Sequence, residues 1–270
     1  TIPGPSLTLT ESTIFAGTDA KKGVPVQIES VRGVHEVVIY RIENGSEVEP
    51  LRETKNGEHT LNYAPEIDFT EATSKLKVVV SDGREGKEAI GYMKAYVNMD
   101  VATLNVGSQP LANNAHVKYP DAFGMVSLND LKTYSVDYAI ANEVNAKNVD
   151  FKFYCFGASG SPRLYSMDNT GKDGEFSGST GKLSAIKVKN LTRFAILSNF
   201  DYENATVASI SSEILSSSIA QSLLDPIAVG NVIAFRTGGS SAAGGGRIGV
   251  MKVINITEPK ELVSNNATAR

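Results

Sequence analysis

The chain has 270 residues, more than one hydrophobic core comfortably supports, so we expect two domains of ordinary size. Its 41% hydrophobic and 21% charged residues are typical of folded globular proteins and indicate neither a disordered tail nor a membrane protein. The net charge is -4, and the sequence contains no run of Lys and Arg, so nucleic acid is not an expected partner. A single cysteine excludes an internal disulfide framework and a Cys-rich zinc site.

Residues 6–97 form short runs that alternate apolar and polar side chains between clusters of Gly, Asn, Asp and Pro. This pattern is typical of an all-β sandwich. Residues 24–31 and 36–43 are two of these runs, and Val38, Tyr40 and Ile42 share one face of the second. Asn44 and Gly45 follow it, a dipeptide that favours a tight hairpin turn.

Two further runs, residues 75–80 and 88–97, flank a turn-rich connection at residues 82–86 and predict a final hairpin. A hairpin in this position closes an immunoglobulin-like module. We therefore predict an immunoglobulin-like β-sandwich over residues 1–98, without the disulfide and tryptophan of antibody domains.

Residues 99–270 mix strand and helix signals and predict an α+β domain rich in strands. Residues 133–145 fit both a helical stripe and a strand, and we favour a helix because the Ala-rich stretch 138–143 is poor strand material. Residues 149–156 predict a central apolar strand that buries Cys155. Residues 201–224 predict one interrupted helix or two, ending before Asp225 and Pro226.

The domain is expected to close with a β-hairpin at about residues 229–257, whose strands are joined by a long flexible loop at residues 238–246. Gly244 to Gly249 match the G-x-G-x-x-G pattern of dinucleotide-binding loops. A strand signal follows this match where a nucleotide site needs a helix, so we reject that interpretation and expect no cofactor.

The closing hairpin, residues 229–237 and 247–253, resembles that of a domain in Bacteroidetes-type secreted surface lipoproteins of uncharacterised function. The Asp-apolar-aromatic strand at residues 149–154 and the Asn-Leu-Thr-Arg-Phe segment at residues 190–194 are similar as well. The resemblance spans roughly residues 100–257, and the long Gly-rich loop departs from it. It implies export to the periplasm or the outer cell surface, with a lipid anchor on a cysteine upstream of Thr1, and it supplies no catalytic residues.

Residues 168–175 gather oxygen ligands and glycines that could wrap a calcium ion. Lys172 stands where the fifth-position ligand of a helical calcium loop belongs, so we favour a solvated turn, with a looser calcium site through Asp168 and Asp173 as the alternative. The acidic cluster of Glu66, Asp68 and Glu71 is also interpreted as a solvated loop. Three scattered histidines and the absence of a Gly-x-Ser-x-Gly elbow give no catalytic motif.

The chain contains no tryptophan, so an aromatic platform for sugar rings would use tyrosines. Tyr165 and Tyr202 stand in polar surroundings, beside Arg163 and Asp201, and are the expected exposed rings. The other tyrosines of this domain suit a core better; they are Tyr119, Tyr134, Tyr138 and Tyr154.

These observations favour a non-catalytic cell-surface protein in which the first domain is a spacer and the second carries an adhesive or ligand-binding surface. The long polar loops at residues 157–182 and 238–247 are the expected surface. The ligand-binding candidates are Tyr165, Tyr202, Arg163, Asp168 and Asp173. A glycan-binding accessory protein of a polysaccharide uptake system and an exported hydrolase are the alternatives, and the expected partner is a protein or glycan at the cell surface.

Overall fold

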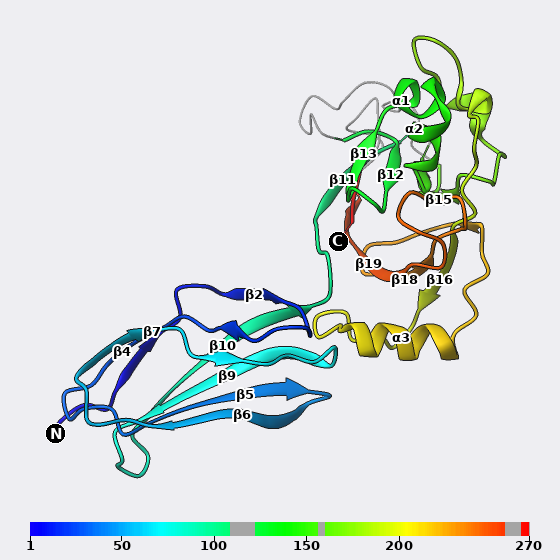
Figure 1. Ribbon diagram of the computed structural model, residues 1–270. Helices are drawn as coiled ribbons and strands as arrows, with labels where there is room; N and C mark the ends of the chain where they lie inside the picture. Colours follow the sequence, from blue (N-terminus) through cyan, green and yellow to red (C-terminus); the bar gives the residue numbers. More distant parts are fainter. Residues whose placement is uncertain (109–121, 156–159, 257–265, 270) are drawn as a thin grey trace. The chain divides into compact units, whose positions relative to one another are not determined.

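The computed structural model describes residues 1–108, 122–155, 160–256 and 266–269, and β-strands dominate it (Figure 1). The mainly β class predicted from the sequence is confirmed. The described residues divide into two compact units, one of residues 1–100 with 203–209 and one within residues 101–202 and 210–269. The two units have separate hydrophobic cores.

The first unit is an immunoglobulin-like β-sandwich of two main sheets. The three-stranded sheet has the order β1 (Ser6–Thr8), β4 (Val26–Glu29), β7 (Thr60–Tyr63). The five-stranded sheet has the order β2 (Thr13–Ala16), β10 (Glu88–Val97), β9 (Thr73–Ser81), β5 (Glu36–Glu43), β6 (Ser46–Thr54). A short pair, β3 (Lys22–Gly23) and β8 (Glu66–Ile67), completes the unit.

The sandwich core forms from alternate residues of both sheets, such as Ile28 of β4, Ile39 of β5 and Val78 of β9. The β5–β6 hairpin turns at Asn44 and Gly45, whose positive φ angles of 52° and 79° fit a type I′ turn. The β9–β10 pairing confirms the predicted final hairpin.

The second unit also packs two five-stranded sheets face to face. One has the order β11 (Leu104–Gly107), β20 (Asn266–Ala269), β19 (Ile248–Ile256), β18 (Val232–Arg236), β16 (Arg193–Leu197). The other has the order β13 (Lys132–Tyr134), β12 (Met125–Ser127), β14 (Phe151–Tyr154), β15 (Arg163–Ser166), β17 (Leu223–Leu224). The pairing of β18 with β19 confirms the predicted closing hairpin, and β14 is central in its sheet, as predicted.

Helices cover the outer face of the sheet that contains β14. α1 (Val136–Ala141), α2 (Glu143–Lys147) and the 3₁₀ helices Asp173–Glu175 and Leu183–Ala185 contribute to a second core cluster with that sheet. Val136 and Phe176 are 0% exposed in this cluster. The unit therefore has three layers, sheet, sheet and helix, which agrees with the predicted α+β class.

Two helix predictions need correction. The helix expected from residue 133 begins only at Val136, because residues 132–134 pair with β12, and it breaks at Asn142, which caps α2 by accepting from the backbone N–H of Asn145 (2.9 Å). Residues 201–224 contain the single helix α3 (Val207–Ser216). The second helical segment is wrong, because Leu223 and Leu224 form β17 and pair with β15.

Candidate functional site

Tyr165 is buried, at 4% exposure, contrary to its expected role as an exposed platform. It lies on β15 opposite Lys152 of β14 and Leu223 of β17, so neighbours on both strands enclose it. Arg163 donates to the Tyr165 hydroxyl (3.3 Å) and forms an ion pair with Asp225 (3.1 Å). A sugar ring cannot stack on Tyr165 in this arrangement.

Tyr202 is half-buried, and the ammonium of Lys252 lies 5.9 Å from the centre of its ring. Lys252 belongs to β19, in the other sheet of the second unit from Tyr165. Tyr202 itself lies outside the strands, beside β19 of one sheet, whereas Tyr165 lies on β15 of the other.

Asp168 is held by Arg193 through two parallel contacts of 2.8 Å, and Ser166 Oγ also donates to it. Burial by itself raises the pKa of Asp168, but the hydrogen bonds from Arg193 and Ser166 more than offset burial and lower it. The carboxylate is thus ionised and already paired with a guanidinium, the geometry of a strong bidentate contact.

Asp173 is 2% exposed and forms an ion pair with Lys152, whose Nζ lies 2.7 Å from its Oδ1. Lys152 is 0% exposed and also donates to the backbone carbonyl of Asn169 (2.9 Å). Burial lowers the pKa of Lys152. Beyond this ion pair, neither carboxylate oxygen of Asp173 has a hydrogen-bond donor in the part of the chain that the structure describes.

Residues 168–175 form turns in which Thr170, Gly171, Gly174 and Glu175 are exposed, as expected of a solvated turn. The two carboxylates offered to calcium, Asp168 and Asp173, are instead paired with an arginine and a lysine. Within residues 1–108, 122–155, 160–256 and 266–269, no three His, Cys, Asp or Glu side chains gather as metal ligands would. In the acidic cluster of Glu66, Asp68 and Glu71, the Asp68 carboxylate forms an ion pair with Arg41 (3.0 Å). His59 Nδ1 lies 2.9 Å from the Ser30 carbonyl oxygen, and His116 lies outside the described residues.

The Gly-rich loop, residues 238–247, forms hydrogen bonds with buried groups of the second unit. Ser241 Oγ donates to Asp150 (2.5 Å), Ser240 Oγ donates to Asn190 Oδ1 (2.7 Å), and the Ala242 N–H donates to the Lys147 carbonyl (2.7 Å). Asp150 is 0% exposed, and burial raises its pKa. Through these contacts the loop closes a buried polar network, while residues 244–247 remain exposed. Residues 157–159 of the other predicted loop lie outside the described residues.

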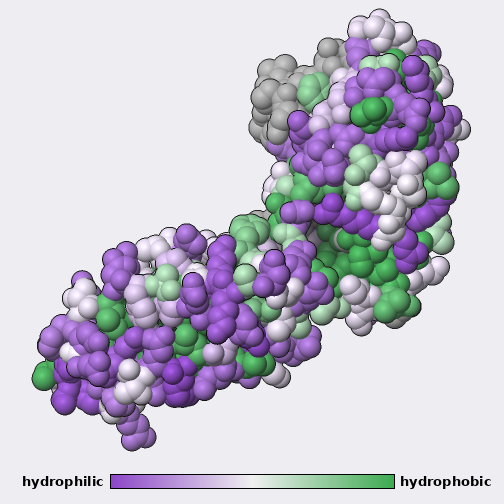
Figure 2. Space-filling view, viewed as in Figure 1, coloured by the Kyte–Doolittle hydropathy of each residue, from purple (hydrophilic) through white to green (hydrophobic). Residues whose placement is uncertain are grey.

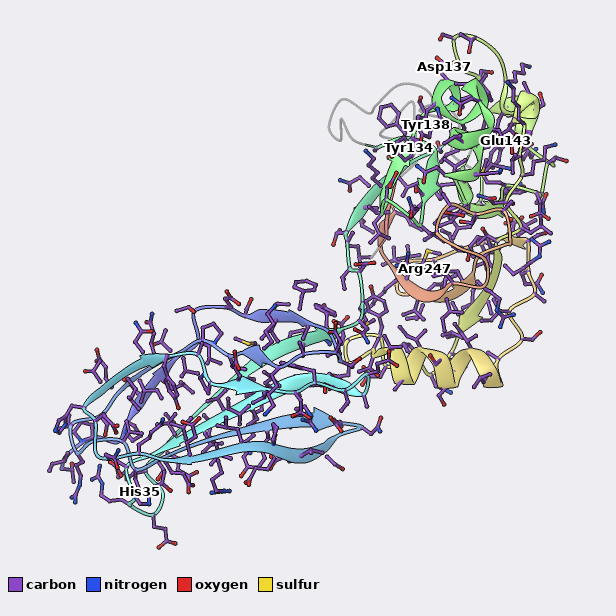
Figure 3. The ribbon with its side chains drawn as sticks, in the orientation of Figure 1. His35, Tyr134, Asp137, Tyr138, Glu143 and Arg247 are labelled. Carbon is purple, nitrogen blue, oxygen red and sulfur yellow. The ribbon has the colours of Figure 1, made fainter. Side chains whose placement is uncertain are left out.

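A different group of side chains forms the strongest candidate site, at the end of the second unit where α1 and α2 lie (Figure 3). We call it the tyrosine site and define it as Asp130, Lys132, Tyr134, Tyr138 and Asn148. The rings of Tyr134 and Tyr138 stack with centroids 3.9 Å apart and planes 13° apart, and both residues are half-buried. The Lys132 ammonium lies 4.9 Å from the centre of the Tyr134 ring.

Hydrogen bonds fix both hydroxyl groups of the tyrosine site. Tyr134 donates to Asp130, and the Asn148 amide donates to Asp130 (2.7 Å) and to the Tyr138 hydroxyl (2.9 Å). The hydrogen bond from Tyr134, followed by that from Asn148, lowers the pKa of Asp130. Burial first, and then the hydrogen bond to Asp130, raises the pKa of Tyr134. The site therefore holds an ionised carboxylate and two phenols in fixed positions around the Asn148 amide.

Local structure places these groups together. Asp130 lies in the β12–β13 turn, where Leu131 takes a positive φ of 52°, and Tyr134 ends β13. Ser135 caps α1 by accepting from the Tyr138 N–H (3.2 Å), which brings the two rings together across the strand–helix junction. Asp137, in the first turn of α1, holds the neighbouring loop by accepting from the Thr180 N–H (3.1 Å).

The sequence favoured Tyr134 and Tyr138 as core residues, and in the structure both are half-buried and pack against the core cluster below α1 and α2, with part of each ring at the surface. The signal that could have identified them is local. Ser135 is a favourable N-cap between two tyrosines four residues apart, with Asp130 four residues before the first.

The fold and the site together define a mainly β chain of two sandwich units whose second unit carries a half-buried cluster of two tyrosines and a carboxylate. Comparisons with known protein families and with curated proteins found no match. None of the helices in the described ranges has the length and apolar character needed to cross a membrane.

Proposed function

We propose that this chain is a non-catalytic binding module of an exported cell-surface protein, and that the tyrosine site of the second unit holds its ligand. The observation that supports the proposal most is the stacked pair of Tyr134 and Tyr138, half-buried at the surface of the unit and fixed by Asp130 and Asn148. Rigid aromatic rings with polar ends contribute binding energy at a low cost in side-chain entropy. The resemblance to Bacteroidetes-type surface lipoproteins supports the proposed location in the periplasm or on the cell surface, with a lipid anchor upstream.

The protonation states of the site support binding over catalysis. The pKa of Asp130 is lowered, so this carboxylate is ionised at neutral pH and accepts hydrogen bonds. The pKa of Tyr134 is raised, so its phenol stays neutral. A general acid or base works best when its pKa lies near the working pH, and both shifts move these groups away from it.

A glycan is the ligand class that the chemistry of the tyrosine site favours. Sugar rings present C–H faces to aromatic rings and hydroxyl groups to carboxylates, and the site offers the stacked rings of Tyr134 and Tyr138 and the exposed carboxylate of Asp130. This supports the accessory role in polysaccharide uptake that the sequence left as an alternative to adhesion.

The test is a binding screen of the full chain against a panel of host and plant glycans, followed by titration calorimetry on any glycan that binds. Tyr134→Ala and Tyr138→Ala each remove one ring of the stack and are expected to weaken binding by about tenfold or more. Tyr202→Ala is the matched control, because Tyr202 is a half-buried tyrosine outside the tyrosine site. Binding that survives both site variants, or that is lost equally in Tyr202→Ala, would contradict the assignment of the site.

A further inference from the structure

Two oppositely charged side chains lie in contact inside the second unit. In the view of Figure 2, hydrophilic residues are spread over the surface of the molecule, where charged side chains ordinarily remain in water. Lys152 of β14 and Asp173 of the 3₁₀ helix Asp173–Glu175 are 0% and 2% exposed, and the Lys152 Nζ lies 2.7 Å from the Asp173 Oδ1. A lysine enclosed in this way is out of reach of reagents in solution, so its amine can react only with groups of the chain itself.

The surroundings of this pair are largely apolar. Lys152 lies opposite Met125 of β12 and Tyr165 of β15, and its Nζ lies 5.9 Å from the centre of the Tyr165 ring. Met125, Tyr165 and Phe176 belong to the buried core cluster under the helices. Charges are costly in such surroundings, which favours transfer of a proton from the ammonium to the carboxylate to give a neutral amine and a neutral acid. Burial lowers the pKa of Lys152, in the direction of the amine.

Backbone groups orient both partners. The Lys152 Nζ donates to the Asn169 carbonyl (2.9 Å) and to the Ser166 carbonyl (3.4 Å). A neutral amine has two N–H donors and one lone pair, so these two contacts use both donors and leave the lone pair for Asp173. The 3₁₀ turn holds Asp173 from the other side, since its carbonyl accepts from the Phe176 N–H (3.3 Å). The amine and the carboxyl group are thus held in one relative position.

Other carboxylates of the second unit lack one of these conditions. Asp150 is 0% exposed, but three hydrogen bonds hold its oxygens. Lys172 and Glu175 form an ion pair (3.0 Å) at the surface, where water solvates the ammonium. The Asp173 carboxyl group has no donor besides Lys152 in the part of the chain that the structure describes. It is therefore a buried carboxyl group that only an amine contacts.

We propose that Lys152 and Asp173 condense to an amide that cross-links β14 to the 3₁₀ helix Asp173–Glu175. The lone pair of the Lys152 Nζ attacks the Asp173 Cγ, and one C–O bond of the carboxyl group breaks. That oxygen leaves as water, with one proton from the acid and one from the amine, so the step is redox-neutral and needs no co-reactant. Cγ is one bond beyond Oδ1, which places the nucleophile near the separation of about 3–3.5 Å of a reactive pair.

The fixed geometry and the apolar surroundings both favour the amide. Two groups held in position react with effective molarities of roughly 10⁵–10⁸ M, and the enclosed site excludes the water that would hydrolyse the product. The bond closes a ring that contains β15, and a covalent cross-link stabilises a fold by restricting the unfolded chain. Variants that lack either side chain cannot form the bond, so comparisons among them measure the ion pair alone. The proposal is independent of the tyrosine site and of its ligand.

The test is intact-protein mass spectrometry of the full chain, purified in the folded state and then incubated just below its unfolding temperature. We expect a species lighter than the sequence mass by one water, present on purification or increasing during incubation. Trypsin does not cleave after an acylated lysine, so the digest should contain residues 148–163 joined to residues 173–182, and tandem mass spectrometry locates the bond. Asp173→Asn should lose ammonia and give the same product, because the amide nitrogen then leaves.

Two matched variants separate this reaction from others. Lys152→Arg keeps a cation beside Asp173 but removes the nucleophilic amine, and should retain the full sequence mass. Lys172→Arg changes the exposed pair and keeps the tryptic site, and should still lose one water.

Two results would overturn the proposal. The full sequence mass in the wild-type chain after incubation would show that the pair stays ionic, and this measurement needs no variant to fold. Loss of one water that persists in Lys152→Arg would show cyclisation of Asp173 onto the backbone nitrogen of Gly174, which follows it in the sequence.

Discussion

The two units bury their interiors with different chemistry. The core cluster of the first unit consists of aliphatic and other apolar side chains contributed alternately by two sheets. The second unit encloses Lys152 and Asp150 at 0% exposure, whereas Arg41 of the first unit keeps 7% and pairs with Glu43 and Asp68 at the edge of the core. An apolar core is specified by the periodicity of each strand, and a charged interior is specified by partners that are distant in the sequence.

The largest expected effect concerns the buried ion pair of the second unit. Lys152→Ala leaves Asp173 enclosed without its cation, and Asp173→Ala does the converse, so each is expected to lower the free energy of unfolding by about 3–5 kcal/mol. The double substitution Lys152→Met with Asp173→Leu removes both charges together and should recover most of that loss. Equilibrium urea denaturation of the three variants measures the difference.

A double variant as unstable as the single ones would contradict this account, since it would mean that the charges themselves hold the 3₁₀ helix Asp173–Glu175 against β14. The same outcome would mean that the buried charges of the second unit stabilise it, as the apolar core stabilises the first unit. It would make the ion pair a source of stability and not only a requirement of charge matching.

The second prediction concerns pH. The folded-state pKa of Asp168 is lowered, so its contribution to stability is present above its unfolded-state pKa of about 3.9 and is lost as pH falls through the folded-state value. Asp168→Asn is therefore expected to cost about 1 kcal/mol at pH 7, a modest value because both partners are about a quarter exposed. The gap between the wild-type chain and this variant should close as the pH is lowered below about 4.

Urea denaturation of both chains at a series of pH values measures this gap. A difference that stays constant from pH 7 to acid pH would show that Asp168→Asn acts through lost packing or a changed hydrogen bond. Burial raises the pKa of Asp150, so its own effect has the opposite sign: its contribution to stability is present below its unfolded-state pKa and is lost as pH rises. Asp150 is common to both chains, so the difference between them isolates Asp168.

Features set by neighbouring residues could be predicted from the sequence, and features set by distant partners could not. Local signals predicted the Asn44–Gly45 hairpin, because turn geometry depends on two residues. Apolar run length predicted β14 as a central strand. The burial of Tyr165 could not be predicted, because it requires β17 to pair with β15 from more than fifty residues away. The second helical segment expected within residues 201–224 is absent for the same reason, since the pairing of Leu223 and Leu224 with β15 overrides the local helix preference.

The tyrosine site could be predicted only in part from the sequence. The stacking of Tyr134 on Tyr138 depends on local spacing and was within reach, but their exposure depends on where the sheet and the helices leave the surface open. Asp168 and Asp173 had the right composition for a cation site. Arg193 and Lys152, 25 and 21 residues away, decide that these carboxylates form ion pairs instead.

The smallest expected effect tests whether the first unit is as locally determined as its sequence suggests. Gly45 has φ of 79°, and no atom lies within 4 Å of the place that a Cβ would take, so Gly45→Ala meets backbone strain and no steric contact. The expected loss is about 1 kcal/mol, the cost of placing a residue with a Cβ in the left-handed region. Thermal denaturation measures it, with Gly239→Ala as a control, because Gly239 also has open space but no positive φ. An equal loss in both variants would mean that the turn conformation carries no special requirement, and that pairing along β5 and β6 sets the hairpin by itself.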